Sequence, residues 1–232
     1  LQNTNRLLVG DVSQGAVETV LTDRDQAWVE EVKPLRWLED GIHFLWVSER
    51  DGWRHLYLAD RDGKTFQLLT PGEYDVISLE GVDEKAGRVY FIASPDRPTQ
   101  RYLYQVPLTG GAAERVTPRD ESGVHHYQMS PDGRFAIHTY SSANQPVIRD
   151  LVRLPTHEVL RLLTDNSDLL EAWSKLDRKP VEFFRIPIGD DVELDGWLMA
   201  PPKVLAGKKY PLLVFVYGEP AGQTVMDRWG GK

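Results

Sequence analysis

The sequence of 232 residues contains no cysteine. It therefore forms no disulfide bond, and metal or redox chemistry through thiolates is excluded. Its longest apolar runs are far shorter than a membrane-spanning helix requires, so we expect no membrane span. Positive charge is also scarce, because 27 Lys and Arg residues stand against 35 Asp and Glu residues and give a formal net charge of −8. Without a basic stripe, such a chain is not expected to bind nucleic acid.

The composition that remains is ordinary for a globular protein, with 41% hydrophobic and 27% charged residues. The length suits one large domain or two modest ones. The sequence starts at Leu1 with neither a methionine nor a signal-peptide pattern, and it stops at Lys232 shortly after an apolar run and a turn. We therefore expect it to be a fragment of a longer protein.

A short motif recurs every 47 residues, as Leu69-Thr70-Pro71, Val116-Thr117-Pro118 and Leu163-Thr164-Asp165. Strand-length runs of β-forming residues, separated by glycine-containing turns, precede each copy. An all-β unit of 40–50 residues with four short strands is typical of a β-propeller blade. A β-sandwich with accidental spacing is the alternative, and the repeated turns and motif argue against it.

We predict three blades, at residues 35–70, 76–117 and 127–164, and the last two strands of an earlier blade at residues 7–22. Three and a half blades do not close a propeller, which typically has four to eight. We therefore expect the remainder of the propeller upstream of Leu1 to be a partner of this segment.

The pattern changes after Thr164. An N-cap within residues 165–168 and helical spacing over residues 169–176 predict a helix, and two strands are expected at 181–188 and 192–200. The unbroken apolar run at residues 212–216 predicts a strand that is buried on both faces, with Tyr217 at its carboxyl end. We therefore divide the chain into propeller blades (1–166), a linker with a helix (167–180) and the start of a second domain (181–232).

The run Tyr-Pro-Leu-Leu-Val-Phe-Val-Tyr-Gly-Glu-Pro at residues 210–220 resembles the first hydrolase-domain strands of the prolyl oligopeptidase superfamily of serine peptidases, and most of all the dipeptidyl peptidase IV subfamily. Residues 48–57 and 130–133 resemble blades of the same subfamily. The resemblance implies a mainly β fold, in which a partial β-propeller is followed by the first strands of an α/β-hydrolase domain. It also implies that Tyr217 supplies part of the oxyanion hole. Glu219 departs from the family's usual glycine.

The rest of that chemistry is missing from the sequence. A hydrolase of this kind needs Gly-x-Ser-x-Gly at its nucleophile, and no glycine here is followed two places on by serine. We expect the nucleophile, acid and base beyond Lys232, so the fragment alone is predicted to be inactive. Tyr217 is the one catalytic residue assigned, no substrate-binding residue is assigned, and neither a metal nor a cofactor is expected.

The six histidines receive structural interpretations. We expect His125 and His126 in a solvated loop between strands, and we interpret His43, His55 and His138 as ordinary blade residues. His157 begins a run that resembles the start of a zinc-protease helix, but Arg161 stands where the second histidine is needed, and the repeat places His157 at a strand edge.

The resemblance implies that the parent protein is a serine exopeptidase that releases X-Pro or X-Ala dipeptides from peptide substrates, with the propeller restricting access. A periplasmic or extracellular location and a homodimer are expected on the same grounds. Two alternatives remain open. One is a propeller that serves as a protein-binding module, and the other is an acylaminoacyl peptidase or oligopeptidase of the same superfamily.

Overall fold

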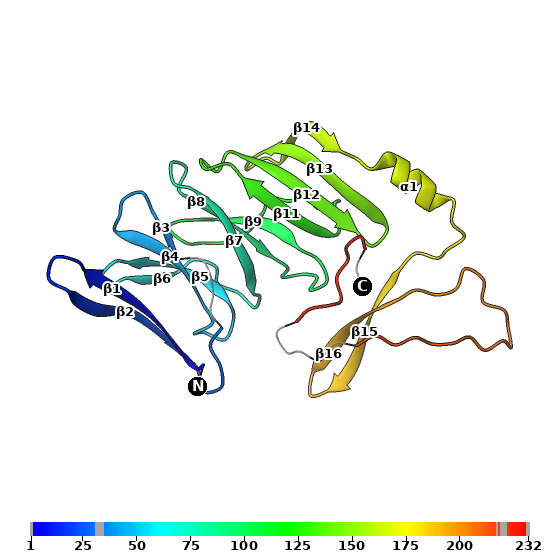
Figure 1. The fold of residues 1–232 in the computed structure, drawn as a ribbon, viewed down its shortest axis with the longest axis horizontal. Helices are drawn as coiled ribbons and strands as arrows, with labels where there is room; N and C mark the ends of the chain where they lie inside the picture. Colours follow the sequence, from blue (N-terminus) through cyan, green and yellow to red (C-terminus); the bar gives the residue numbers. More distant parts are fainter. Residues whose placement is uncertain (1, 31–34, 217, 219–221, 231–232) are drawn as a thin grey trace.

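The fold is taken from a computed structural model, which describes residues 2–30, 35–216, 218 and 222–230. This part of the chain holds three four-stranded antiparallel sheets, two two-stranded sheets and one short helix. Figure 1 shows the larger sheets standing side by side in chain order. The fold is therefore mainly β, as the sequence predicts.

The three four-stranded sheets are called blades 1, 2 and 3. In each blade the strands lie in chain order, and every neighbouring pair is antiparallel. Blade 3 begins three residues before the start predicted from the sequence, and the predicted ranges of blades 1 and 2 enclose their observed strands. The strands are β3 (Arg36–Trp37), β4 (His43–Ser48), β5 (His55–Asp60) and β6 (Phe66–Leu68) in blade 1; β7 (Val76–Asp83), β8 (Arg88–Ala93), β9 (Tyr102–Pro107) and β10 (Glu114–Arg115) in blade 2; and β11 (Val124–Met129), β12 (Phe135–Ser142), β13 (Gln145–Arg153) and β14 (Glu158–Thr164) in blade 3.

The hydrophobic core lies between the sheets. Strand β8 illustrates this, because Val89 and Phe91 pack toward blade 1 while Tyr90 and Ile92 pack toward blade 3. Successive side chains of a strand point to opposite faces, so a strand between two blades is apolar throughout. This packing explains the continuous apolar runs in the middle of each repeat.

The threonines of the repeated motif close the blades. The Thr70 hydroxyl accepts a hydrogen bond from the Leu56 backbone N–H at 2.9 Å, and the Thr117 hydroxyl accepts one from the Leu103 N–H at 2.8 Å. Both threonines are buried. Each threonine follows the short fourth strand of its blade, and its hydroxyl therefore pairs with a backbone N–H of the third strand that the fourth strand no longer reaches. The third copy, Thr164, lies within β14 and pairs with Arg149.

A two-stranded sheet precedes blade 1, where the sequence predicts two strands of an earlier blade. Its strands are β1 (Thr4–Asp11) and β2 (Ala16–Arg24). The buried carboxylate of Asp23 accepts hydrogen bonds from the Trp46 indole at 2.7 Å, the Ser48 hydroxyl at 2.8 Å and the Arg50 guanidinium at 2.6 Å. This one carboxylate ties β2 to the first blade.

The segment after blade 3 contains helix α1 (Ser167–Ser174) and a hairpin of β15 (Glu182–Gly189) and β16 (Val192–Leu198), all close to their predicted ranges. Asn166 is the N-cap residue, with φ 51°, and its side chain donates to the Val147 carbonyl instead of capping the helix. Among the described residues, no helix is both long and apolar enough to cross a bilayer.

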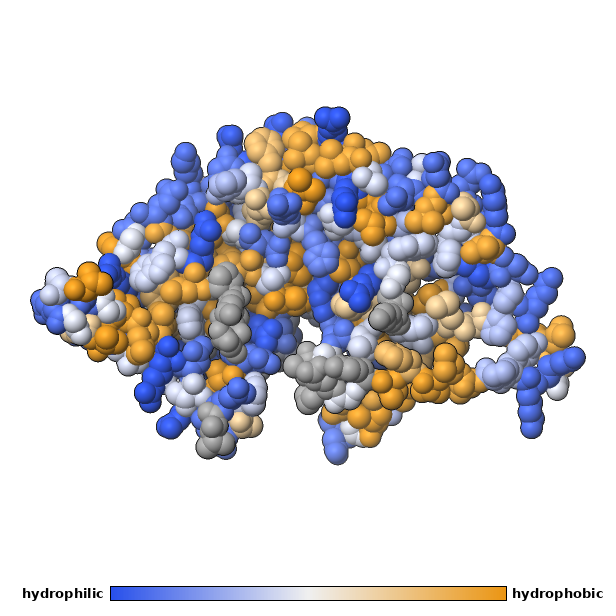
Figure 2. All heavy atoms as spheres, viewed as in Figure 1, coloured by the Kyte–Doolittle hydropathy of each residue, from blue (hydrophilic) through white to orange (hydrophobic). Residues whose placement is uncertain are grey.

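Apolar side chains are exposed on two of these elements. Figure 2 shows hydrophobic surface over blade 3 near β14 and over the β15–β16 hairpin. On β14 these residues are Val159, Leu160, Leu162 and Leu163, and the hairpin exposes Phe183, Phe184, Ile186, Ile188, Val192, Leu194 and Leu198.

Candidate functional site

Tyr217, the residue predicted for the oxyanion hole, lies outside the described residues, as does Glu219. The segment before it differs from the prediction. Residues 212–216 form no strand and are exposed, with Leu213 at 94%. The prediction of a doubly buried strand is therefore wrong for this structure. A strand needs a neighbour to pair its backbone, and no described strand pairs with this run.

The residues that follow are fixed to the blades through Asp227. Its backbone N–H donates to the Thr99 carbonyl at 2.8 Å, and its carboxylate accepts from the Ala143 N–H at 2.8 Å and the Gln100 side chain at 2.9 Å. Thr99 and Gln100 belong to the β8–β9 connection, whereas Ala143 lies in the β12–β13 turn. One aspartate thus joins the C-terminal segment to blades 2 and 3 together.

A mostly apolar pocket lies beside this attachment, between α1, the β15–β16 hairpin and the C-terminal segment. Trp173, Phe183, Trp197, Met226 and Trp229 form its walls. The rings of Trp173 and Trp229 meet edge to face, with centroids 4.8 Å apart. Such walls suit an apolar side chain, and no nucleophile is among the lining residues.

A second cluster of functional groups is buried between blades 2 and 3. The ring nitrogen Nδ1 of His125 lies 2.9 Å from Nε2 of His138, and Nδ1 of His138 lies 3.1 Å from a carboxylate oxygen of Asp150. The two imidazole planes are nearly parallel, at 5°. Both histidines are fully buried. His125 is thus part of strand β11, and the prediction of a solvated loop is wrong for it.

Strand geometry explains the correction. Residues 125 and 127 lie on the same face of β11, whereas His126 points the other way and is exposed. Register then brings His138 opposite Tyr127, and Asp150 opposite His138. The adjacent histidine pair and the tyrosine two residues further were the available signal, but the partners on other strands depend on pairing that the sequence does not show.

His157 completes the cluster. It has φ 55° in the turn before β14, and its Nε2 lies 2.8 Å from the Tyr127 hydroxyl, which also lies 2.9 Å from the Thr117 hydroxyl. Its place beside a strand end was predicted, but its burial was not.

Burial controls the protonation of these groups. It lowers the pKa of His125 to about 2, assisted by the positive charge that His138 and His157 would carry, and it lowers the pKa of His157 to about 4. Burial also raises the pKa of Glu121, whose side chain lies beside His125. His125 and His157 are therefore neutral near pH 7, with ring nitrogens free of a second proton.

Known proteins resemble the chain along nearly all of its length. A probable dipeptidyl peptidase 4 from Aspergillus flavus is 27% identical over 240 residues, and this alignment covers 99% of the chain and 30% of that protein. Dipeptidyl peptidase 4 of Trichophyton equinum is 27% identical over 90% of the chain and 28% of its own length. The chain thus spans about 30% of the length of these relatives.

Solved structures show the same fold. The crystal structure of Porphyromonas gingivalis dipeptidyl peptidase 4 superimposes with a TM-score of 0.90 at 28% identity, over 99% of the chain and 32% of that protein. A putative dipeptidyl aminopeptidase IV from Bacteroides ovatus gives a TM-score of 0.84 at 23% identity, over 99% of the chain and 35% of its own. Residues 1–147 match the family described as the dipeptidyl peptidase IV (DPP IV) N-terminal region, and the chain therefore belongs to that family.

Proposed function

We propose that this sequence is the part of a serine dipeptidyl peptidase that connects the last propeller blades to the start of an α/β-hydrolase domain. The full-length protein would release X-Pro or X-Ala dipeptides from the amino termini of peptides. The observation that carries the proposal is the similarity to Porphyromonas gingivalis dipeptidyl peptidase 4, because it covers 99% of the chain and so continues beyond the propeller region.

In this proposal the blades form a wall that admits only short or unfolded peptides to the hydrolase domain. Cores packed between successive blades give such a wall rigidity. The apolar side chains of the β15–β16 hairpin and of residues 212–216 support the second part of the proposal. Exposed apolar surface of this extent marks an interaction site, and here it would pack against the remaining strands of the hydrolase domain.

Tyr217 has the proposed catalytic role. Its phenol would donate a hydrogen bond to the oxyanion that forms when a serine attacks the scissile carbonyl. A donor placed in this way contributes about 3–4 kcal/mol to transition-state stabilisation. The nucleophile, acid and base would come from other parts of the full-length protein, since this sequence lacks the Gly-x-Ser-x-Gly pattern.

The test is hydrolysis of an Ala-Pro anilide by the full-length protein and by its Tyr217→Phe variant. We expect kcat to fall by about a hundredfold or more with little change in KM, because the lost hydrogen bond forms only in the transition state. Tyr210→Phe is the control, since among the described residues the Tyr210 hydroxyl bonds to nearby backbone, at Leu205 and Lys203. Its kcat should stay close to that of the wild type.

The outcomes separate the candidates. Equal activity in Tyr217→Phe and the wild type would overturn the catalytic role of the phenol, while the proposal that the full-length protein is a dipeptidyl peptidase would stand. Complete inactivity of the wild type on dipeptidyl substrates would overturn the exopeptidase proposal. Hydrolysis of N-acylated or internal peptide bonds in its place would indicate an acylaminoacyl peptidase or an oligopeptidase.

We also propose that the full-length protein is exported to the periplasm or the cell exterior and forms a homodimer, as the family resemblance implies. Cell fractionation and light scattering of the purified protein test the two statements separately. Recovery in the cytosol would overturn the first, and a monomeric mass would overturn the second.

A further inference from the structure

We propose that Glu121, His125 and His138 form a binding site for a divalent transition-metal ion, of which Zn²⁺ is the best match. The site lies between blades 2 and 3 and is independent of the proposed peptidase activity. Glu121 comes from the connection between β10 and β11, His125 from β11 and His138 from β12.

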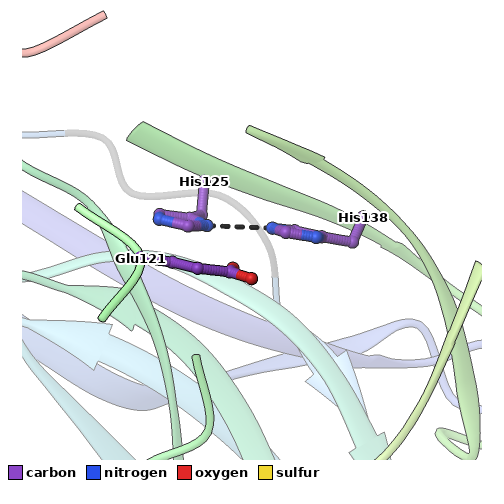
Figure 3. Close-up of side chains that lie close together, drawn as sticks. All are labelled: Glu121, His125 and His138. Carbon is purple, nitrogen blue, oxygen red and sulfur yellow. Dashed lines mark hydrogen bonds between the residues drawn. The ribbon is translucent and has the colours of Figure 1, made fainter. Parts of the chain in front are cut away.

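The three side chains already converge. One potential ligand atom from each lies within 4.8 Å of the other two. Figure 3 shows the two imidazoles edge to edge, with the Glu121 carboxylate extending toward the gap between them. The facing nitrogens are 2.9 Å apart. In a tetrahedral zinc site with bonds of 2.0–2.1 Å, ligand atoms are about 3.3 Å apart. The rings would therefore have to separate by about half an ångström, and the Glu121 oxygen, which lies within 4.8 Å of the ring nitrogens, would have to move closer to them.

Asp150 fixes the tautomer that a metal requires. A carboxylate oxygen of Asp150 accepts a hydrogen bond from Nδ1 of His138 at 3.1 Å, which places a proton on that nitrogen. Nε2 of His138 then presents its lone pair to the gap. A carboxylate that holds the far side of a ligating histidine is the usual support of a zinc site.

The present hydrogen bonds leave the cluster incomplete. Because His138 Nε2 is the acceptor, Nδ1 of His125 donates the shared proton. An oxygen of Glu121 is buried beside them and has no hydrogen-bond partner among the described residues. Unpaired buried polar atoms destabilise a fold, so a ligand that engages this carboxylate is favoured.

Binding of the ion would move protons and no electrons. The ion would bind Nε2 of His138 and Nδ1 of His125, whose proton moves to Nε2 of the same ring. A proton held by Glu121 would be released to solvent, and no electron is transferred. Two imidazole nitrogens and one carboxylate suit Zn²⁺, whereas Mg²⁺ and Ca²⁺ prefer oxygen ligands alone. A solvent molecule would take the fourth position.

The test is titration of the chelator-treated full-length protein with Zn²⁺, followed by calorimetry, and with Co²⁺, followed by visible absorption. We expect a saturable site of one ion per chain in these residues, tetrahedral Co²⁺ bands, and a higher unfolding temperature with Zn²⁺ but not with Mg²⁺. Glu121→Gln and His125→Asn should each weaken Zn²⁺ binding by more than about tenfold and remove the Co²⁺ bands.

His126→Ala is the matched control, because His126 is exposed on the opposite face of the same strand. It should bind Zn²⁺ as the wild type does. Circular dichroism checks that the variants are folded, and Glu121→Gln, which alters a half-buried connection, keeps the test valid if His125→Asn does not fold. The proposal is overturned if the wild type gives no tetrahedral Co²⁺ bands, if Glu121→Gln binds Zn²⁺ unchanged, or if His126→Ala abolishes binding.

Discussion

The hydroxyl of Thr117 lies 2.8 Å from the backbone N–H of Leu103, 14 residues earlier in the chain, and also 2.9 Å from the Tyr127 hydroxyl in the next blade. Thr70 accepts from Leu56 across the same sequence separation. The repeated Leu-Thr-Pro motif thus has a structural role. Where the short fourth strand has ended, the threonine hydroxyl accepts the hydrogen bond that a backbone carbonyl of that strand would otherwise accept.

Replacing Thr117 with valine should destabilise the chain. The shape is kept, but the buried Leu103 N–H loses its acceptor, which costs about 1–3 kcal/mol. The Tyr127 hydroxyl loses one partner and keeps His157. Urea unfolding of the full-length protein, followed by tryptophan fluorescence, measures this loss. Thr109→Val is the control, since Thr109 lies exposed in a hairpin turn. Equal midpoints for the two variants would contradict the role assigned to Thr117.

Removing the Asp23 carboxylate should lower the free energy of unfolding more than Thr117→Val does. In Asp23→Ala the buried Trp46 indole and Ser48 hydroxyl lose their acceptor and the Arg50 charge loses its partner. The two buried donors that lose their acceptor cost about 1–3 kcal/mol each, and the part-buried Arg50 pair adds to this loss. The fluorescence of Trp46 should change as well, since its indole then meets a different environment.

Asp62→Ala provides the comparison for Asp23. Its partner Lys64 is 80% exposed, and Asp62 itself is largely exposed. Exposed ion pairs contribute about 0–1 kcal/mol. A loss in Asp23→Ala no larger than that in Asp62→Ala would show that the carboxylate does not hold β2 to blade 1.

The stability of the fold should depend on pH through Glu80. Burial raises the pKa of this carboxyl, an effect only partly offset by the Ser78 hydroxyl and by His126. A raised folded-state pKa means that its contribution to stability is complete below the unfolded-state pKa and is lost as pH rises through the folded-state value. Glu80→Gln removes the ionisation, so the variant should gain unfolding temperature over wild type at pH 8 and little at pH 4.

Thermal unfolding across that pH range checks the Glu80 prediction. The exposed Glu73 supplies the control variant Glu73→Gln, which should follow the wild type at every pH. A Glu80→Gln variant that gains the same stability at pH 4 as at pH 8 would rule out ionisation of Glu80 as the cause.

Local patterns predicted most of the blades. Turn glycines, strand-length apolar runs and the motif at Thr70, Thr117 and Thr164 mark units that fold from neighbouring segments, since every blade pairs consecutive strands. The hairpin of β15 and β16 was predictable for the same reason.

Features that depend on distant partners were missed. The residues at 212–216 have the composition of a buried strand, yet burial requires neighbours that this run does not meet. His125 is the opposite case, a residue that looks exposed in the sequence and is buried in the structure. His125 looks solvated beside His126, but its surroundings come from His138 and Asp150 on two other strands, and cross-strand register places them together. Alternation along β11 was readable from the sequence, whereas the facing side chains were not.

The three hydrogen bonds of Asp227 have a consequence for chain length. The chain leaves blade 3 at Thr164, contacts the β12–β13 turn through the Arg178–Asn144 hydrogen bond, and is held again at Ala143 and Thr99 by residue 227, so the segment after Arg178 leaves the blades and returns to them. The entropy of closing such a segment rises only slowly, by about 0.6 kcal/mol for each doubling of its length. We therefore expect insertions in the exposed 203–209 loop to lengthen this segment while the blades keep their spacing, provided that Asp227 is retained.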